Sequence, residues 1–207
     1  MEGMEIQGIH QFLGIPYAKP PVGALRFIPT EPAEPWTGIR SCRKLGHAAP
    51  QLYVPGLTFL EKEETLDEDC LYLNVTTPDT TGKLPVLCWI HGGAFQKGSA
   101  TAGINPPAFA REGMVVVNMN YRRGALGFMD MSGYLGDAYR QSGNSGLLDI
   151  IEALRWVRKN IASFGGDPDN VTIMGQSAGA KLCGALTIMK KARGLFQKAI
   201  LCSGAVQ

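Results

Sequence analysis

The fold is decided by residues 171–179, which read Val-Thr-Ile-Met-Gly-Gln-Ser-Ala-Gly. β-Branched residues open this stretch, a Gly-x-Ser-x-Gly motif follows, and a helix-compatible segment continues from Ala178, so we predict a strand, a sharp turn and a helix. Such a turn lifts the hydroxyl of Ser177 clear of the sheet, and its flanking glycines are needed because a Cβ would collide with neighbouring backbone. Ser177 is therefore the candidate nucleophile. Taken alone, the motif fits a small-residue loop equally well.

A second strand end strengthens the case for a catalytic serine. Residues 84–90 form a nearly continuous apolar run, typical of a strand buried on both faces, and His-Gly-Gly-Ala-Phe follows at residues 91–95. Small residues after a buried strand let backbone N–H groups point at a ligand, as an oxyanion hole requires. We expect the amides of Gly93 and Ala94 to donate from one side and that of Ala178 from the other. A tight turn after a strand is the structural alternative.

The remaining periodicity predicts an α/β protein. Further strands are expected near residues 70–75, 115–121 and 198–202, and a short hairpin or an edge strand at residues 4–13. One helix is clear, because spacings of three and four place on one face Leu147, Leu148, Ile151, Leu154, Val157 and Ile161. Asn144 or Ser145 can cap the start of this helix, and residues 165–168 end it. Alternating strands and helices predict a mostly parallel sheet with helices on both faces and ligands at the carboxyl ends of the strands.

Composition and charge exclude several classes of protein. A formal net charge of +2 over 207 residues gives no electrostatic reason to bind nucleic acid or a membrane surface. No run reaches the roughly 18 apolar residues of a membrane span, and nothing at the N-terminus reads as a signal peptide. We therefore expect a cytoplasmic protein, although a clipped N-terminus would leave secretion open. The five cysteines lack C-x-x-C spacing and clustered histidines, so we expect free thiols, no metal site and no cofactor.

A resemblance to a known family rests on motifs spread along the chain. These motifs are residues 14–18, 23–27, 68–74, 91–95, 120–122, 143–149, 164–168 and 175–179. In this order they resemble the type-B carboxylesterase and cholinesterase family, from about residue 10 to the last residue. The resemblance implies the α/β-hydrolase fold, Ser177 as the nucleophile, and an oxyanion hole formed by Gly93, Ala94 and Ala178. It also implies a small-molecule ester as the substrate.

The resemblance extends to the groups beside the serine, with some departures. We expect Gly92, Gln176 and Phe95 to contact the substrate. Gln176 stands where the family usually has Glu, so its hydrogen bonds can persist while a local negative field is lost. Family members with a disulfide at Cys70 pair it with a position that corresponds here to Ala49, so we expect Cys70 to be free.

The largest departure lies after Ser177, where the chain contains no Asp, Glu or His. In α/β-hydrolases the triad runs Ser, then acid, then His. We therefore expect residues 1–207 to be the N-terminal portion of a single α/β-hydrolase domain, incomplete at its C-terminus. His91 is a substitute base only if it reaches the serine, and its position favours support of the oxyanion loop. The sequence predicts a serine carboxylic ester hydrolase that is inactive or weak as this chain alone.

Two other readings stay open. The first is a non-catalytic binding protein or pseudo-esterase on the same fold, against which Ser177 and the intact oxyanion loop speak. The second is one half of a split or nicked enzyme. Whether the chain is the N-terminal portion of a longer enzyme or one half of a split enzyme, we expect a second partner besides the ester. This partner is a C-terminal chain or segment that completes the domain.

Overall fold

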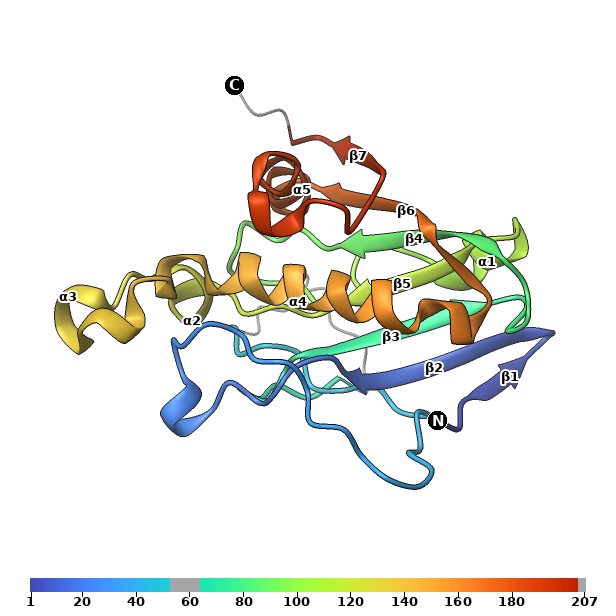
Figure 1. Ribbon diagram of the computed structural model, residues 1–207, viewed down its shortest axis with the longest axis horizontal. Helices are drawn as coiled ribbons and strands as arrows, with labels where there is room; N and C mark the ends of the chain where they lie inside the picture. The colour runs from blue at the N-terminus through green and yellow to red at the C-terminus, as the bar shows by residue number, and fades with distance from the viewer. Residues whose placement is uncertain (53–63, 205–207) are drawn as a thin grey trace.

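A seven-stranded sheet runs through the centre of the structure, a computed structural model that describes residues 1–52 and 64–204. The strand order is β1-β2-β3-β5-β4-β6-β7 (Figure 1). The strands are β1 (Met4–Ile6), β2 (Ile9–Pro16), β3 (Tyr72–Thr77), β4 (Leu84–Ile90), β5 (Val115–Met119), β6 (Gly166–Gln176) and β7 (Lys198–Cys202). Strands β5, β4, β6 and β7 run parallel, whereas β1, β2 and β3 pair in antiparallel fashion and extend the sheet beyond β5.

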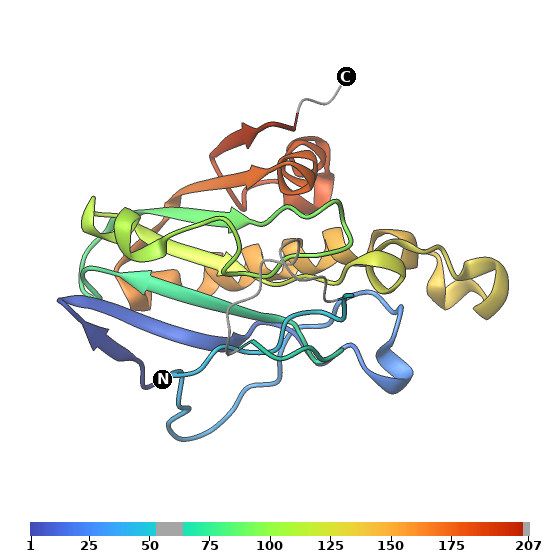
Figure 2. The ribbon, with the colours of Figure 1, turned by 180° about the vertical axis from the view of Figure 1, so that it is seen from behind.

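Helices cover both faces of this sheet, as the sequence predicts. The helices are α1 (Pro106–Arg111), α2 (Gly124–Phe128), α3 (Ser132–Leu135), α4 (Ser145–Asn160) and α5 (Ala178–Ile188). Helix α4 lies across the face seen in Figure 1, and α1 packs against β3 and β5 on the face seen in Figure 2. The core between these layers is formed by aliphatic side chains of β3 to β6 and of the inner face of α4. In the described part of the chain, no helix combines the length and the apolarity that a bilayer crossing needs.

Helix α4 has the predicted apolar face and begins at the predicted place, but the predicted side-chain cap is wrong. The side chain of Asn144 makes no capping hydrogen bond, and the hydroxyl of Ser145 is buried without a partner among the described residues. The reason is that a 3₁₀ turn, Ser142–Asn144, leads directly into α4, so that backbone carbonyls accept the first N–H groups. The predicted end is confirmed, since a second 3₁₀ turn stops at Gly165 with φ of 78°.

The register brings the carboxyl ends of the parallel strands to one level. Ile90 of β4 pairs with Met119 of β5 on one side and with Gly175 of β6 on the other. Gly175 in turn pairs with Leu201 of β7. The loops that follow β5, β4, β6 and β7 therefore leave the sheet side by side, which is the geometry that gathers functional groups in open α/β sheets.

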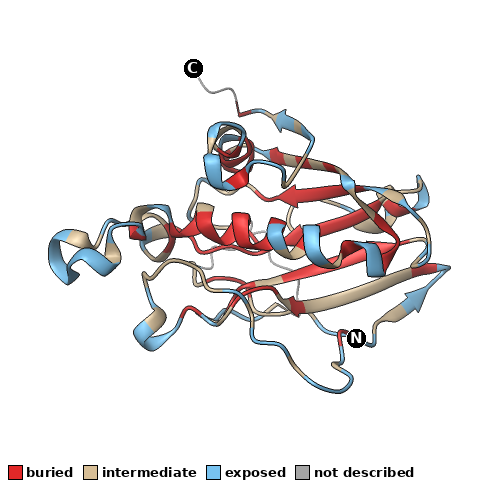
Figure 3. Cartoon of the chain, viewed as in Figure 1, coloured by how far each residue is buried: buried red, intermediate tan, exposed pale blue. Residues whose placement is uncertain are grey.

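Burial differs between the centre and the edge of the sheet. Strand β5 is buried along its whole length, whereas β7 exposes Ile200 and Leu201 (Figure 3). All five cysteines are free thiols, which confirms the expectation for Cys70, and Ala49 and Cys70 both lie in the hydrophobic core.

Candidate active site

Ser177 occupies the sharp turn between β6 and α5. Its backbone has φ of 56° and ψ of −118°, a conformation that costs a non-glycine residue about 1–3 kcal/mol and persists only where the surroundings enforce it. The Ser177 N–H donates to the carbonyl oxygen of Cys202 at 2.9 Å, which ties the turn to β7. A Cβ on Gly175 would collide with the backbone of Gly179, and one on Gly179 would collide with the carbonyl oxygen of Ile90. Both glycines are therefore required by close backbone contact, as predicted.

The loop after β4 presents backbone N–H groups beside this turn. Gly93 and Ala94 both have positive φ, 109° and 55°. The carbonyl oxygen of Gly93 accepts from the N–H groups of Gln96 and Lys97, each at 3.0 Å, and this closes the loop into a compact turn. Within residues 1–52 and 64–204, no hydrogen-bond acceptor pairs with the N–H of Gly93, Ala94 or Ala178. These amides are free to bind a ligand oxygen.

Gly92 brings the two motifs together. A Cβ built on Gly92 would lie 3.3 Å from Cβ of Ser177 and 2.9 Å from Oε1 of Gln176. The loop therefore passes directly over the serine, and only glycine leaves room there. A cavity of about 240 Å³ opens beside Gly92 and Gln176, and Ser177 is not among its lining residues. The lining residues of the cavity are Trp89, Gly92, Gly93, Gly98, Ala102, Gly103 and Gln176, so that its described walls carry no charged side chain.

Phe95 is positioned by packing rather than by this cavity. Its ring meets that of Phe128 edge to face, with centroids 5.3 Å apart and an interplanar angle of 75°. Its carbonyl oxygen accepts from the N–H of Gly124 at 2.7 Å, which anchors the loop to the start of α2. A direct contact between Phe95 and a substrate stays a prediction.

His91 supports the loop from inside the protein. The side chain is fully buried, and Nδ1 lies 2.7 Å from the carbonyl oxygen of Gly92. Burial, together with the charge of Arg123, lowers the pKa of His91 to about 3. A ring with this pKa is a weak base at neutral pH, and its Nδ1 is already engaged with the loop. These observations agree with the supporting role expected for His91.

The family follows from the sequence match. Residues 1–207 match the model of the carboxylesterase family. The chain belongs to this family. It is 47% identical to para-nitrobenzyl esterase from Bacillus subtilis over 99% of its own length and 42% of that protein. It is 44% identical to cocaine esterase from Homo sapiens over 95% of its own length and 36% of that protein. The chain thus spans about two fifths of the length of these relatives.

Solved carboxylesterases share the fold. A carboxylesterase of Geobacillus stearothermophilus superposes with a TM-score of 0.86 at 46% identity and covers 96% of this chain and 40% of its own. A para-nitrobenzyl esterase structure gives a TM-score of 0.91 at 46% identity over 99% of this chain and 42% of its own. Juvenile hormone esterase from Manduca sexta, solved with OTFP covalently attached, gives 0.85 at 37% identity over 95% of this chain and 37% of its own. The α/β-hydrolase fold predicted from the sequence is therefore confirmed.

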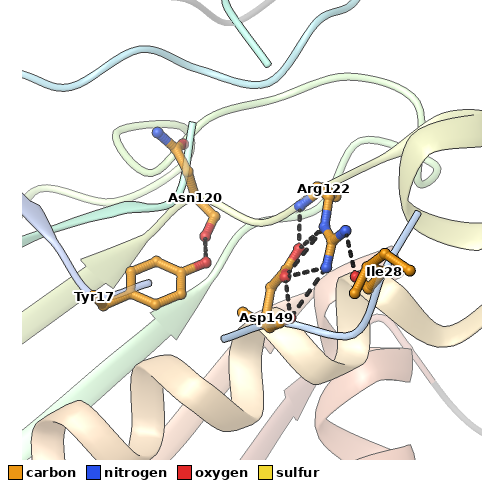
Figure 4. A network of polar contacts seen from close by, with 6 residues as sticks. Tyr17, Ile28, Asn120, Arg122 and Asp149 are labelled. Carbon is orange, nitrogen blue, oxygen red and sulfur yellow. Dashed lines mark hydrogen bonds and ion pairs between the residues drawn. The ribbon is translucent and has the colours of Figure 1, made fainter. Parts of the chain in front are cut away.

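A buried ion pair behind the site was not assigned a role from the sequence. Arg122 follows β5, and its guanidinium pairs with the Asp149 carboxylate of α4 at 2.8 Å, with both side chains almost fully buried (Figure 4). Arg122 also donates to the carbonyl oxygen of Ile28 at 3.0 Å. Burial opposes the charge of Arg122, but the Asp149 carboxylate outweighs this effect and raises the pKa of Arg122. The available signal was that both residues lie in the motifs 120–122 and 143–149 that resemble the family. Periodicity gave none, because Asp149 lies opposite the predicted apolar face of its helix.

Two further residues that hold the loop after β4, residues 91–98, were missed. Arg123 and Gln51 both bind the backbone of Gly98, at the far end of the loop. The available signal was a second arginine directly after a buried strand. No group of three or more His, Cys, Asp or Glu within the described ranges is arranged to hold a metal ion.

Proposed function

We propose that this carboxylesterase-family chain carries the nucleophile and the oxyanion hole of a serine carboxylic ester hydrolase. Ser177 attacks the ester carbonyl, and the N–H groups of Gly93, Ala94 and Ala178 bind the oxygen that becomes negative. The alcohol leaves, an acyl-enzyme remains on Ser177, and water releases the acid. The observation that carries the proposal is the approach of Gly92 to within van der Waals reach of Ser177, because it places free amides beside a serine on a strained turn.

The histidine and the acid of the triad are proposed to lie outside these residues. The chain has no Asp, Glu or His after Ser177, and the upstream His91 is fully buried with its Nδ1 bonded to the loop. Without a base to accept its proton, the Ser177 hydroxyl is a weak nucleophile. We therefore expect weak or no turnover from residues 1–207 alone.

The proposed substrate class is a small-molecule carboxylic ester. Para-nitrobenzyl esterase and juvenile hormone esterase are named for esters of different kinds, so the proposal extends only to the ester bond. The cavity of about 240 Å³ lined by Gly92 and Gln176 supports contacts from these two residues. Phe95 is proposed to shape the same region from behind, through its packing on Phe128.

We also propose that residues 1–207 form the N-terminal portion of one domain whose remaining part covers β7. Ile200 and Leu201 are 45% and 40% exposed on this edge strand, and exposed apolar edges pair with other strands. The 207-residue chain by itself should therefore self-associate in size-exclusion chromatography. A monodisperse, folded monomer would contradict this part of the proposal.

Covalent labelling tests the nucleophile. The protein that includes the segment proposed to complete the domain, called the intact protein below, is treated with a fluorophosphonate probe, and the modified peptide is found by mass spectrometry. We expect modification of Ser177 and none in a Ser177→Ala variant, while Ser203, which is exposed directly after β7, should stay unmodified. Absence of labelling would favour a non-catalytic binding protein on the same fold. Ordinary hydrolysis of p-nitrophenyl butyrate by the purified 207-residue chain would show that the triad is not completed from outside.

A further inference from the structure

A buried arginine lies behind the loop that carries the Gly93 and Ala94 amides. Arg123 is 2% exposed and stands between β5 and α2. One terminal nitrogen of its guanidinium donates to the carbonyl oxygen of Gly98, and the other donates to that of Ala49 at 3.1 Å. Arg123 therefore joins the far end of this loop to a segment that is distant in the sequence.

Gln51 completes the attachment of Gly98. The Gly98 N–H donates to Oε1 of Gln51 at 2.8 Å, and Nε2 of Gln51 donates back to the Gly98 carbonyl oxygen at 3.0 Å. Arg123 also contacts Oε1 of Gln51 at 3.4 Å. Both polar groups of the Gly98 peptide backbone are thus held by side chains, so this end of the loop cannot shift without breaking several hydrogen bonds.

The position of Gly98 fixes the start of the loop as well. A Cβ on Gly98 would lie 2.8 Å from the carbonyl oxygen of Gly92 and 2.6 Å from Nδ1 of His91, so the two ends of the loop are in direct contact. Between them, Ala94 keeps a positive φ of 55°, which costs a residue with a side chain about 1–3 kcal/mol. Such a turn keeps its shape only while its ends are held.

Within residues 1–52 and 64–204, no carboxylate forms a hydrogen bond with Arg123. Burial lowers the pKa of Arg123, and the negative charge of Glu64 offsets only part of this effect. The acceptors of Arg123 are peptide carbonyls and the amide of Gln51, all of them neutral, whereas the adjacent Arg122 pairs with Asp149. Nε of Arg123 is buried and has no partner within residues 1–52 and 64–204. A buried cation without a bonded anion is costly, and a neutral side chain of similar length would avoid this cost. The presence of Arg123 therefore indicates that its several guanidinium donors or its positive charge serve a function.

We propose that Arg123 is a positioning residue for ester hydrolysis. By holding the Gly98 carbonyl, it fixes the loop so that the amides of Gly93 and Ala94 point at the oxyanion formed beside Ser177. Its positive charge adds to the field that favours the negative oxygen. The inference rests on the proposed function, because it requires these two amides to form the oxyanion hole. Arg123 does not line the described cavity, so it acts through the loop and not on the substrate.

The test compares variants of the intact protein. Arg123→Met removes the charge and both terminal donors, and Arg123→Lys keeps the charge alone. Arg140→Met is the control, since the side chains of Arg140 and of its partner Asp137 are 72% and 84% exposed. For each variant, hydrogen exchange of the peptide covering residues 92–98 is measured by mass spectrometry, together with Tm and with kcat and KM for p-nitrophenyl butyrate. The exchange measurement does not depend on turnover.

In Arg123→Met, the exchange rate of residues 92–98 should rise relative to the parent protein. This rise should be at least tenfold larger than the rise in any other peptide. The kcat of Arg123→Met should fall about 10²-fold, as for loss of one oxyanion donor, with KM changed less than about threefold. Arg123→Lys should recover part of kcat through its charge, and the control should match the parent protein.

Three results would overturn the inference. The first is unchanged exchange in residues 92–98 of Arg123→Met. The second is a loss of kcat that only follows the fall in Tm, with faster exchange spread over the whole chain. The third is a loosened loop with unchanged kcat, which would mean that Arg123 does not position catalytic groups. Failure of the proposed function has a different signature, because Ser177 of the parent protein would then resist the fluorophosphonate.

Discussion

The ring of His91 stacks on the ring of Tyr121, with centroids 4.4 Å apart and planes inclined by 18°. The Tyr121 hydroxyl donates to the carbonyl oxygen of His91 at 2.8 Å. His91, the first residue of the loop after β4, is therefore held both by its ring and by its backbone. Tyr121 lies in the segment after β5, which also supplies Asn120 and Arg123 to the loop. Asn120 Oδ1 accepts from the N–H of Ala100 at 2.7 Å. This one segment therefore supports the loop at its start, at Gly98 and just beyond it.

Burial of neutral His91 makes stability depend on pH. Its pKa is about 3 in the folded protein and about 6.5 in the unfolded chain, so the unfolded state binds the additional proton between these values. The contribution of His91 to the free energy of unfolding is complete above pH 6.5. It is lost as the pH falls toward 3, by about 1.4 kcal/mol per pH unit. Urea unfolding between pH 7 and pH 4.5 should show this slope. The His91→Asn variant, which keeps a donor for the loop, should take up one proton fewer on unfolding and so show a smaller slope. An identical slope in both proteins would contradict it.

The elbow glycine Gly179 should tolerate no side chain. A Cβ there would meet the carbonyl oxygens of Ile90 and His91 at the end of β4, so Gly179→Ala should destabilise the protein by about 1–3 kcal/mol and displace Ser177. The matched control is Gly133→Ala in α3, where no atom lies within 4 Å of the added Cβ. This variant should be neutral or slightly more stable. Urea midpoints and fluorophosphonate labelling of both variants measure the difference, and equal effects would refute the steric argument.

The Arg122–Asp149 pair should be far more sensitive than a surface pair. Asp149→Asn leaves the guanidinium of Arg122, whose side chain is 3% exposed, without its counter-charge, and such a loss costs about 3–5 kcal/mol. The comparison is Asp169→Asn, which breaks the exposed pair with Arg158 and should cost at most about 1 kcal/mol. Equilibrium unfolding in urea gives both values. Comparable losses would contradict this prediction, because they would mean that the acceptors Arg122 already has, the Ile28 carbonyl oxygen and the Thr30 hydroxyl, suffice without the carboxylate.

The sequence predicted the elements whose signals are local. Strand β4 has the predicted bounds because its apolar run is continuous. Strand β6 begins five residues before the predicted start at Val171, because Gly166 pairs with Leu84 across a shift in register, whereas residues 165–168 read as a loop. The Gly-x-Ser-x-Gly turn and the Gly-Gly-Ala loop were located because close backbone contact permits few residue types.

The support behind the site could not be predicted in the same way. Arg123 and Gln51 are separated by 72 residues and share Gly98 as a partner, and nothing in either local sequence specifies that contact. Asn144 matched the statistics of a helix cap, but the preceding 3₁₀ turn supplied backbone acceptors first. Long-range polar contacts and competing backbone bonds are tertiary effects, which periodicity does not report.

Gln176 is a neutral, polar side chain that lines the cavity of about 240 Å³ and directly precedes Ser177. It is exposed, its Oε1 lies close to Gly92, and the described walls of the cavity are otherwise apolar or backbone. Gln176→Glu adds a carboxylate of the same shape, which should attract a cationic substrate and repel an anionic one by about 1 kcal/mol, or about fivefold in kcat/KM. Hydrolysis of a choline ester and of a neutral ester of the same acid measures the ratio, and added salt should reduce the difference. Since the variant keeps the amides of Gly93 and Ala94 in place, kcat for the neutral ester should stay nearly constant. A ratio that does not respond to the substitution would place the alcohol part of the substrate away from Gln176.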